Sequence, residues 1–318
     1  MSHPRVDIGI PVFARAAYVA QAIDSVAAQS YPYWRLTISE DGGATEPVKR
    51  AVEPYLDDER VRYITPGIRL GLARHKSSLV EHGDGKYVAL LDDDDCWQPE
   101  WLARRVEFLE THASCVLVWA GHLDVDADGV EVGRSAFPFP EGVHSSREFI
   151  QAMMRANVVA TPSVLIRRDA YVRAGNTFDP SYVHINDYEL WLRMGMLGSV
   201  GFLAVHDCGY RVHPQQMSRR RDRGLDHLRL IDQLDGLLQM HNPQLRLSTA
   251  ARRHQKADRL LSAALDAAEQ GQQRTAARHI TAAAGLAPRV LASSRGLGAI
   301  AATVGGRKLS QRIGAMRS

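Results

Sequence analysis

The sequence predicts an α/β protein in which helices flank an open, mostly parallel sheet and an α-helical extension follows at the C-terminus. Over the first hundred residues, short apolar segments alternate with segments whose apolar residues recur every three or four positions. This alternation is typical of a parallel sheet with helices on both faces. Four consecutive aspartates, at 92–95, directly follow one apolar segment, and after about residue 219 the helical pattern stands alone.

The composition limits the class of protein. The 318 residues are 45% hydrophobic and 24% charged, which is ordinary for a globular chain and enough for one large domain and a smaller one. A net charge of +3 is too small to indicate a nucleic-acid partner, and none is expected. Three cysteines, Cys96, Cys115 and Cys208, are too few and scattered for a disulfide framework or a zinc site. Because residues 1–20 lack a signal-peptide layout and no apolar run suits a membrane span, a cytoplasmic location is expected.

The N-terminal half is expected to alternate strands and helices. The apolar run from Val6 to Phe13, with a proline near its end, suits a buried strand, and residues 16–29 carry apolar side chains at helical spacing. A strand at 33–39 is followed by the turn-forming Asp41-Gly42-Gly43. The remaining elements expected here are a helix at 46–56, a strand at 61–64, a helix at 72–81, a strand at 87–91 and a helix opened by Pro99.

The pattern changes after residue 115. Two apolar runs between 116 and 132 surround Asp126-Ala127-Asp128-Gly129, a hairpin signal. The later elements expected are strands at 159–167 and 200–212 and helices at 186–195, 225–240, 251–270 and 273–284, with Gly271 separating the last two helices and Gly285 capping the last before Pro288. The last two helices resemble one tetratricopeptide-like hairpin, which we interpret as an appended bundle. Two domains are therefore expected, 1–218 and 219–318.

The aspartate cluster indicates a metal site. On an extended chain Asp92 and Asp94 point together and Asp93 points away. Like charges this close are unfavourable unless protons or a cation neutralise them, and ligands usually bind at the carboxyl edge of an open α/β sheet. Oxygen ligands suit Mg²⁺ or Mn²⁺, which keep waters and share phosphate oxygens. The alternative is a solvated acidic turn before a helix. Glu40-Asp41, after another strand on the same edge, is a second acidic site.

Several motifs stand in the order found in family 2 glycosyltransferases, and residues 5–218 resemble that family. The motifs are Ile10-Pro11-Val12-Phe13, Ser25-Val26 with Gln29, Glu40-Asp41-Gly42-Gly43, Gly71 with Arg74, Gly85-Lys86-Tyr87, Leu91-Asp92-Asp93-Asp94-Asp95, Asn186-Asp187-Tyr188-Glu189-Leu190-Trp191-Leu192-Arg193, and Tyr210-Arg211-Val212-His213 with Ser218. The resemblance implies a GT-A fold and metal-dependent, inverting transfer of a sugar from a nucleoside-diphosphate donor, with UDP favoured. The acceptor would be a hydroxyl group of a surface polysaccharide, glycolipid or secondary metabolite.

The resemblance also implies roles by position. On the donor side, Pro11 and Val12 would border the base through backbone groups, Asp41 would contact the base, Arg74 would meet a phosphate, and Asp92 and Asp93 would hold the ribose and the metal-bound diphosphate. Asp94 would ligate Mn²⁺ or Mg²⁺ directly, with His213 as a further metal contact. Asp187 occupies the general-base position. The alternatives are a helix cap for Asp187, a backbone-bonded loop residue for His213 and a solvated helix face for Arg74.

Some positions depart from the family pattern. Phe13-Ala14 replaces a tyrosine-asparagine pair, Glu40 replaces the first of two aspartates, Gly43 replaces a serine, and Asn186 replaces an acidic residue. These changes concern the choice of base and sugar and leave Asp41, Asp94 and Asp187 intact. A non-catalytic nucleotide-sugar-binding scaffold is the main alternative. A nucleotidyltransferase ranks last, because no glycine-rich loop follows the first strand.

Two motif-like segments are rejected, and two basic segments are kept as hypotheses. Residues 124–129 imitate a calcium loop, but Ser135 stands where glutamate is required, and Gly83-Asp84-Gly85-Lys86 lacks the spacing of a phosphate loop. The arginines at 219–221 and 223 indicate a solvated linker, a loop over the diphosphate or a lipid contact. The basic C-terminal tail, with Arg307, Lys308, Arg312 and Arg317, suggests peripheral contact with the inner membrane face. The helical extension could also form a homodimer surface.

Overall fold

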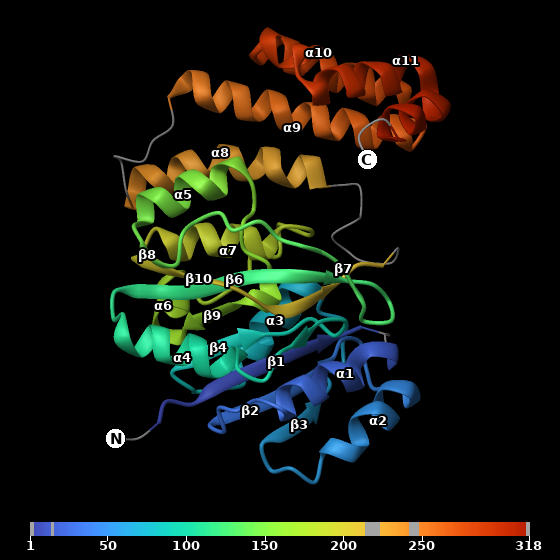
Figure 1. Cartoon of the computed structure of the whole chain (residues 1–318). Helices are drawn as coiled ribbons and strands as arrows, with labels where there is room; N and C mark the ends of the chain where they lie inside the picture. The colour runs from blue at the N-terminus through green and yellow to red at the C-terminus, as the bar shows by residue number, and fades with distance from the viewer. Residues whose placement is uncertain (1–2, 14–15, 214–222, 242–247, 316–318) are drawn as a thin grey trace. The chain divides into compact units, whose positions relative to one another are not determined.

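The computed structural model describes residues 3–13, 16–213, 223–241 and 248–315 (Figure 1). The chain divides into two compact units, Met1–Pro214 and Gln215–Ser318. Each unit has its own buried apolar cluster.

A ten-stranded sheet forms the centre of the N-terminal unit. Its strands are β1 Val6–Val12, β2 Trp34–Glu40, β3 Val61–Ile64, β4 Tyr87–Leu90, β5 Cys96–Trp97, β6 Cys115–Val125, β7 Glu131–Arg134, β8 Gly142–His144, β9 Val164–Arg167 and β10 Ser199–Arg211. They follow the order β3-β2-β1-β4-β9-β6-β10-β5, with β7 beside β6 and β8 beside β10. The predicted α/β fold with an open sheet is confirmed. Parallel pairing is confined to β3-β2-β1-β4 and β6–β10, because β9 runs antiparallel between β4 and β6.

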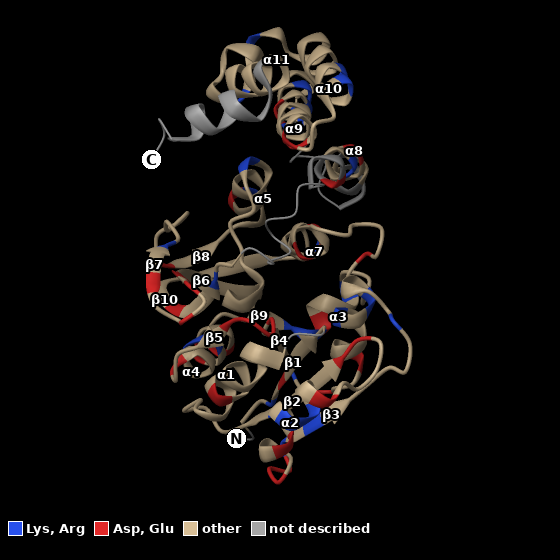
Figure 2. Cartoon of the chain, turned by 90° about the vertical axis from the view of Figure 1, so that its right-hand side faces the viewer, with Lys and Arg blue, Asp and Glu red and all other residues tan. Residues whose placement is uncertain are grey.

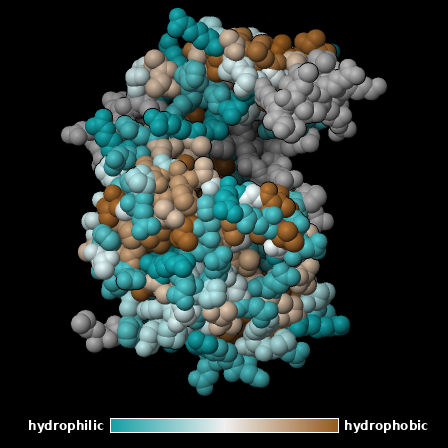
Figure 3. All heavy atoms as spheres, viewed as in Figure 1, coloured by the Kyte–Doolittle hydropathy of each residue, from teal (hydrophilic) through white to brown (hydrophobic). Residues whose placement is uncertain are grey.

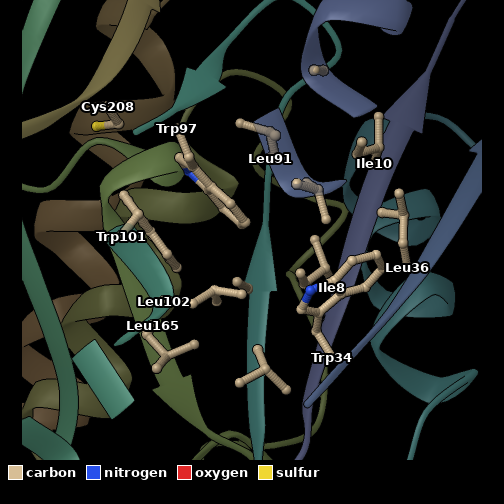
Figure 4. Close-up of a cluster of buried hydrophobic side chains, with 14 of the residues drawn as sticks. Ile8, Ile10, Trp34, Leu36, Leu91, Trp97, Trp101, Leu102, Leu165 and Cys208 are labelled. Carbon is tan, nitrogen blue, oxygen red and sulfur yellow. The ribbon is translucent and has the colours of Figure 1, made fainter. Parts of the chain in front are cut away.

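Helices cover both faces of this sheet. They are α1 Ala16–Ala27, α2 Glu46–Val52, α3 Leu72–Glu81, α4 Trp101–Thr111, α5 Ser146–Arg155, α6 Arg168–Arg173 and α7 Asn186–Gly195, with 3₁₀ turns η1 Glu53–Tyr55 and η2 Thr161–Ser163. Even-numbered residues of β1, such as Ile8 and Ile10, share one apolar cluster with α1, α2 and α4 (Figure 4). On the opposite face Gly9 lies against Leu79 of α3, where an added Cβ would come within 3.1 Å of the Leu79 Cβ. Alternation along β1 therefore buries both faces.

Some predicted elements differ from the structure. The strand expected at 159–167 begins only at Val164, because residues 161–163 form η2 around Pro162, which lacks an N–H group for strand pairing. Four elements were not predicted from the sequence: β5, β8, α5 and α6. For α5 the signal was present, since Ser145 and Glu148 form a capping box at its start. The expected hairpin is confirmed by β6 and β7, and its turn closes with a hydrogen bond from the Asp126 N–H to the Val130 carbonyl.

A buried ion pair joins α4 to β10. The Arg105 guanidinium donates to both carboxylate oxygens of Asp207 at 2.8 Å, and both side chains are fully buried. Arg105 also donates to the Ser163 carbonyl, so it ties η2 to the same place. Arg105 therefore joins α4 to η2 and to β10.

We expect Asp207→Asn to destabilise the N-terminal unit by about 3–5 kcal/mol, because it leaves a buried guanidinium without its counter-charge. Thermal unfolding should shift down by about 10 °C. Asp169→Asn is a matched control, since Asp169 pairs with Arg173 on the exposed surface of α6. It should cost less than about 1 kcal/mol. Equal losses in the two variants would contradict this assignment.

The C-terminal unit is helical. It contains α8 Arg223–His241, α9 Thr249–Glu269, α10 Gln273–Leu286, η5 Pro288–Ala292 and α11 Ser294–Ala315. Its core consists largely of alanines, including Ala257, Ala264 and Ala276, and these small side chains let the helices approach closely. The expected cap at Gly285 is wrong: α10 continues through Gly285 to Leu286, and Ala287 is its C-cap. Gly271 separates α9 from α10 as predicted, with a φ of 78°.

The described helices and surface add two observations. None of the described helices is long and apolar enough to cross a membrane. The face of the N-terminal unit visible in Figure 3 is mainly hydrophilic, with apolar residues in separate patches.

Candidate functional site

The carboxyl ends of β1, β2 and β4 meet at one edge of the sheet, because the three strands are parallel. Figure 2 looks onto this edge, where acidic segments lie near β4, β5 and β9. Pro11 and Val12, the last residues of β1, are buried there. The Gly9 carbonyl accepts from Leu91 on the β4 side, so Pro11, two residues on, turns its missing N–H toward the same side. Since β4 ends at Leu90, proline costs no sheet hydrogen bond at this position.

The acidic pair after β2 shapes two loops. The Asp41 carboxylate accepts from the backbone N–H groups of Leu70 and Gly71, at 2.6 and 2.9 Å. Glu40 accepts from the backbone and hydroxyl of Thr45 and from the Tyr63 hydroxyl. Both carboxylates are therefore engaged in holding loops at the rim of the site. The predicted base contact of Asp41 stays a prediction.

The two glycines after Asp41 have positive φ angles, 93° for Gly42 and 121° for Gly43. Residues with a Cβ rarely adopt such angles. The serine usual in the family at position 43 would be strained here, so this loop follows a path that requires glycine.

We expect Asp41→Ala to free the loop before α3. Losing both hydrogen bonds should speed amide hydrogen exchange at Leu70 and Gly71 by about tenfold, which corresponds to about 1.4 kcal/mol. Hydrogen-exchange mass spectrometry or NMR measures this directly. Asp58→Ala is the control, because Asp58 pairs with Arg60 at the surface, away from that loop. Unchanged protection at Leu70 and Gly71 would contradict the role given to Asp41.

The four aspartates after β4 have different surroundings. Asp92 is the most exposed, with 28% of its side chain accessible, whereas Asp93, Asp94 and Asp95 are buried. Asp93 accepts from the backbone N–H of Phe13 at 3.4 Å, which joins the ends of β1 and β4. Burial, followed by the charges of Asp94 and Asp92, raises the pKa of Asp95 well above its usual value. Its Oδ2 atom is buried without a hydrogen-bond partner among the described residues.

Asp94 and His213 come together from distant parts of the chain. The Oδ2 atom of Asp94 lies 3.0 Å from Nε2 of His213, and each side chain is only 7% exposed. The Nε2 atom of His213 therefore contacts a carboxylate, and not a backbone group as the alternative prediction for this residue would require. The described residues contain no group of three or more His, Cys, Asp or Glu residues placed to hold a metal. Asp94 and His213 thus form a two-residue pair.

Lys76 of α3 is a site residue that the sequence analysis missed. Its Nζ lies 3.1 Å from Oδ1 of Asp92, and only 4% of its side chain is exposed. Burial lowers the pKa of Lys76, but the charges of Asp92 and Asp187 outweigh burial and raise it. The residue chosen from the sequence, Arg74, is exposed on the same helix. A signal was present, because Lys76 follows Leu72 by four residues and precedes Val80 by four, on the apolar face of α3.

Asp187 lies in the first turn of α7. Its Oδ2 accepts from the Thr161 hydroxyl at 2.9 Å, and its Oδ1 accepts from the Tyr188 N–H at 2.7 Å. The N-cap of α7 is Ile185, whose side chain makes no capping hydrogen bond, so Asp187 does not serve as the N-cap. The charge of Asp187, like that of Asp92, acts on the buried Lys76. Its general-base role remains a prediction.

Some predicted features lie outside the described residues. These are Ala14, Ser218 and the arginines at 219–221. Arg317 also lies outside them, and nothing is described of the side chains of Arg307, Lys308 and Arg312. The calcium-loop imitation is resolved: Asp126 Oδ1 accepts from the Asp128 and Val130 N–H groups and closes the hairpin turn.

Solved structures with a similar fold bind nucleotide sugars. S. aureus TarS 1–349 in complex with UDP-GlcNAc has a TM-score of 0.65 and 14% identity, and the match covers 97% of this chain and 90% of that one. The mannosyltransferase PcManGT of Pyrobaculum calidifontis, in complex with GDP-Man and Mn²⁺, has a TM-score of 0.53 and 17% identity, over 98% and 85% of the chains. Because the sequence identities are this low, the similarity to these structures shows a shared fold alone.

Sequence relatives carry glycosyltransferase names. Bacillus subtilis TuaG, a putative teichuronic acid biosynthesis glycosyltransferase, is 24% identical over 207 residues, which is 64% of this chain and 77% of TuaG. Escherichia coli WfgD, a UDP-Glc:alpha-D-GlcNAc-diphosphoundecaprenol beta-1,3-glucosyltransferase, is 22% identical over 67% of this chain and 78% of WfgD. The family model for Glycosyl transferase family 2 matches residues 7–171, about half of the chain. Together with the fold and the acidic edge of the sheet, this match shows that the chain belongs to glycosyl transferase family 2 and is a glycosyltransferase.

Proposed function

We propose that this glycosyltransferase moves a sugar from a nucleoside-diphosphate donor to a hydroxyl group of a growing surface polysaccharide or glycolipid. The favoured donor is a UDP-sugar, and the transfer inverts the configuration at the anomeric carbon. The observation that carries the proposal is the close pairing of Asp94 with His213 beside three further aspartates at the carboxyl edge of the sheet. The polysaccharide names of relatives such as TuaG support the acceptor class.

The donor set fits Mn²⁺ or Mg²⁺. A carboxylate and an imidazole 3.0 Å apart, both buried, can bind one ion from the same side. Beside this pair, the Oδ2 atom of Asp95 is buried without a hydrogen-bond partner among the described residues, and burial, followed by the charges of Asp94 and Asp92, raises the pKa of that carboxyl. Mg²⁺ and Mn²⁺ accept few protein ligands when phosphate oxygens and waters complete the shell. The chemistry that such an ion supplies is stabilisation of the negative charge on the leaving diphosphate.

The protein's own residues would perform the remaining tasks. Pro11, Val12 and the loop held by Asp41 would border the nucleotide base, and Asp92 would contact the ribose. Lys76, already paired with Asp92, would supply a positive charge to the diphosphate. Asp187 would take the proton from the acceptor hydroxyl as it attacks, which is typically worth about 10²–10⁴-fold in rate. A base opposite the leaving group gives direct displacement and inversion.

Titration calorimetry with UDP, GDP and dTDP, with and without Mn²⁺, tests the donor site. We expect one of the three nucleotides to bind in a Mn²⁺-dependent manner, and UDP is the nucleotide that we favour. NMR of the product formed from the matching nucleotide sugar and an acceptor then reads the anomeric configuration. No binding of any nucleotide under either condition would contradict the proposal. Nucleotide binding without sugar transfer would favour the nucleotide-sugar-binding scaffold.

A further inference from the structure

Arg211, the last residue of β10, is a buried cation next to the aspartate cluster. Only 2% of the residue is exposed. A buried guanidinium is unfavourable unless its N–H groups are hydrogen-bonded. Here the Nε donates to the Asp94 carbonyl, Nη1 donates to the carbonyls of Asp126 and Ala127, and Nη2 donates to Oε1 of Gln21, each at 2.8 Å. Nearly all hydrogen-bond donors of the guanidinium are therefore occupied.

These contacts join three segments that are far apart in the sequence. They are the aspartate cluster after β4, the turn between β6 and β7, and helix α1. The backbone N–H of Arg211 also donates to Oδ1 of Asp95 at 2.8 Å, so the strand itself is tied to the cluster. The Arg211 side chain therefore holds the backbone of Asp94, and the Arg211 backbone N–H ties the end of β10 to Asp95.

His213 is held by the same arrangement. It stands two residues after Arg211, and the ring of Tyr18 on α1 lies against both. The Arg211 guanidinium carbon is 4.5 Å from the centre of the Tyr18 ring, and the His213 ring centre is 5.9 Å from it. The Arg211–Tyr18 contact is a cation–π interaction, which favours one placement of the guanidinium.

We propose that Arg211 is the positioning residue that sets the spacing between Asp94 and His213 and so preorganises the cation site. This inference rests on the proposed function. The residue acts through Asp94 and His213 and needs no contact with substrate. A lysine keeps the charge but offers one ammonium instead of a planar fork, so it cannot reach the Asp94 carbonyl, the turn carbonyls and Gln21 together.

The test compares Arg211→Lys with Arg105→Lys. Arg105 is a matched control because it is equally buried, stacks on Trp101 and also serves β10, but its partner is Asp207. Mn²⁺ affinity is measured by electron paramagnetic resonance of the free ion in the presence of UDP, and UDP affinity without metal by calorimetry. We expect Arg211→Lys to weaken Mn²⁺ binding by about tenfold or more, while metal-free UDP binding changes by less than about threefold. Arg105→Lys should lower the unfolding temperature and leave Mn²⁺ affinity of the folded protein within about threefold.

A second variant covers the case in which Arg211→Lys does not fold. Tyr18 is only partly buried, so Tyr18→Leu should fold. It should weaken Mn²⁺ binding in the same direction by a smaller factor. Mn²⁺ affinity that is unchanged in Arg211→Lys and Tyr18→Leu, or reduced equally by Arg105→Lys, would overturn the inference alone. No Mn²⁺-dependent UDP binding in the wild type would overturn it together with the metal part of the proposed function.

Discussion

Asp94→Asn should lower kcat/KM by on the order of 10²–10³-fold, the loss typical when one preorganised contact to developing charge is removed. The substitution keeps the size of the side chain but removes its negative charge. An asparagine next to His213 presents at most one neutral oxygen to a cation, and neutral amide oxygens bind Mn²⁺ more weakly than carboxylates do. Calorimetry should accordingly show that UDP binding no longer depends on Mn²⁺.

Two comparisons make the Asp94 result specific. His213→Gln removes the second member of the pair and should cause a loss in the same direction. Glu46→Gln alters an exposed carboxylate that pairs with Lys49 on α2 and should leave both measurements unchanged. An Asp94→Asn enzyme with wild-type activity and wild-type Mn²⁺ dependence would rule out this aspartate as the ligand. Asp92 and Asp93 would then be the remaining candidates for the metal ligand.

The first half of the fold follows closely from local patterns. The predicted bounds of β3 and α3 agree with the structure to the residue, because each is delimited by glycine, proline or charged residues and each shows a clear period. Short apolar stretches are harder to interpret. The direction of β9 depends on its insertion between β4 and β6, a contact between residues more than forty positions apart that no local pattern reveals.

The candidate site likewise combines residues that local patterns predict with residues that only the fold brings together. The aspartates at 92–95 stood out because four adjacent charges after an apolar strand are costly without a partner. The pairing of Asp94 with His213 could be expected only from the family resemblance, since 118 residues separate the two in sequence. Lys76 was missed because a lysine is normally assigned to the solvated face of a helix. Its position on the apolar face of α3 was the signal, and only the fold shows that this face ends beside Asp92.

Asp187→Asn should lower kcat by about 10²–10⁴-fold while leaving the affinity for UDP and Mn²⁺ within about threefold. The two effects separate because Asp187 lies on α7, whereas the proposed cation ligands follow β4 and β10. Ile185 is the N-cap of α7, and an asparagine can still accept from Tyr188 or from Thr161.

Thr161→Val is the matched control for Asp187→Asn. It removes the hydroxyl that donates to Asp187 but keeps the carboxylate, so it should lower kcat by a smaller factor. A variant Asp187→Asn that loses UDP affinity in proportion to kcat would instead place this carboxylate in donor binding. The distinction matters because the charges of Asp92 and Asp187 both act on the buried Lys76.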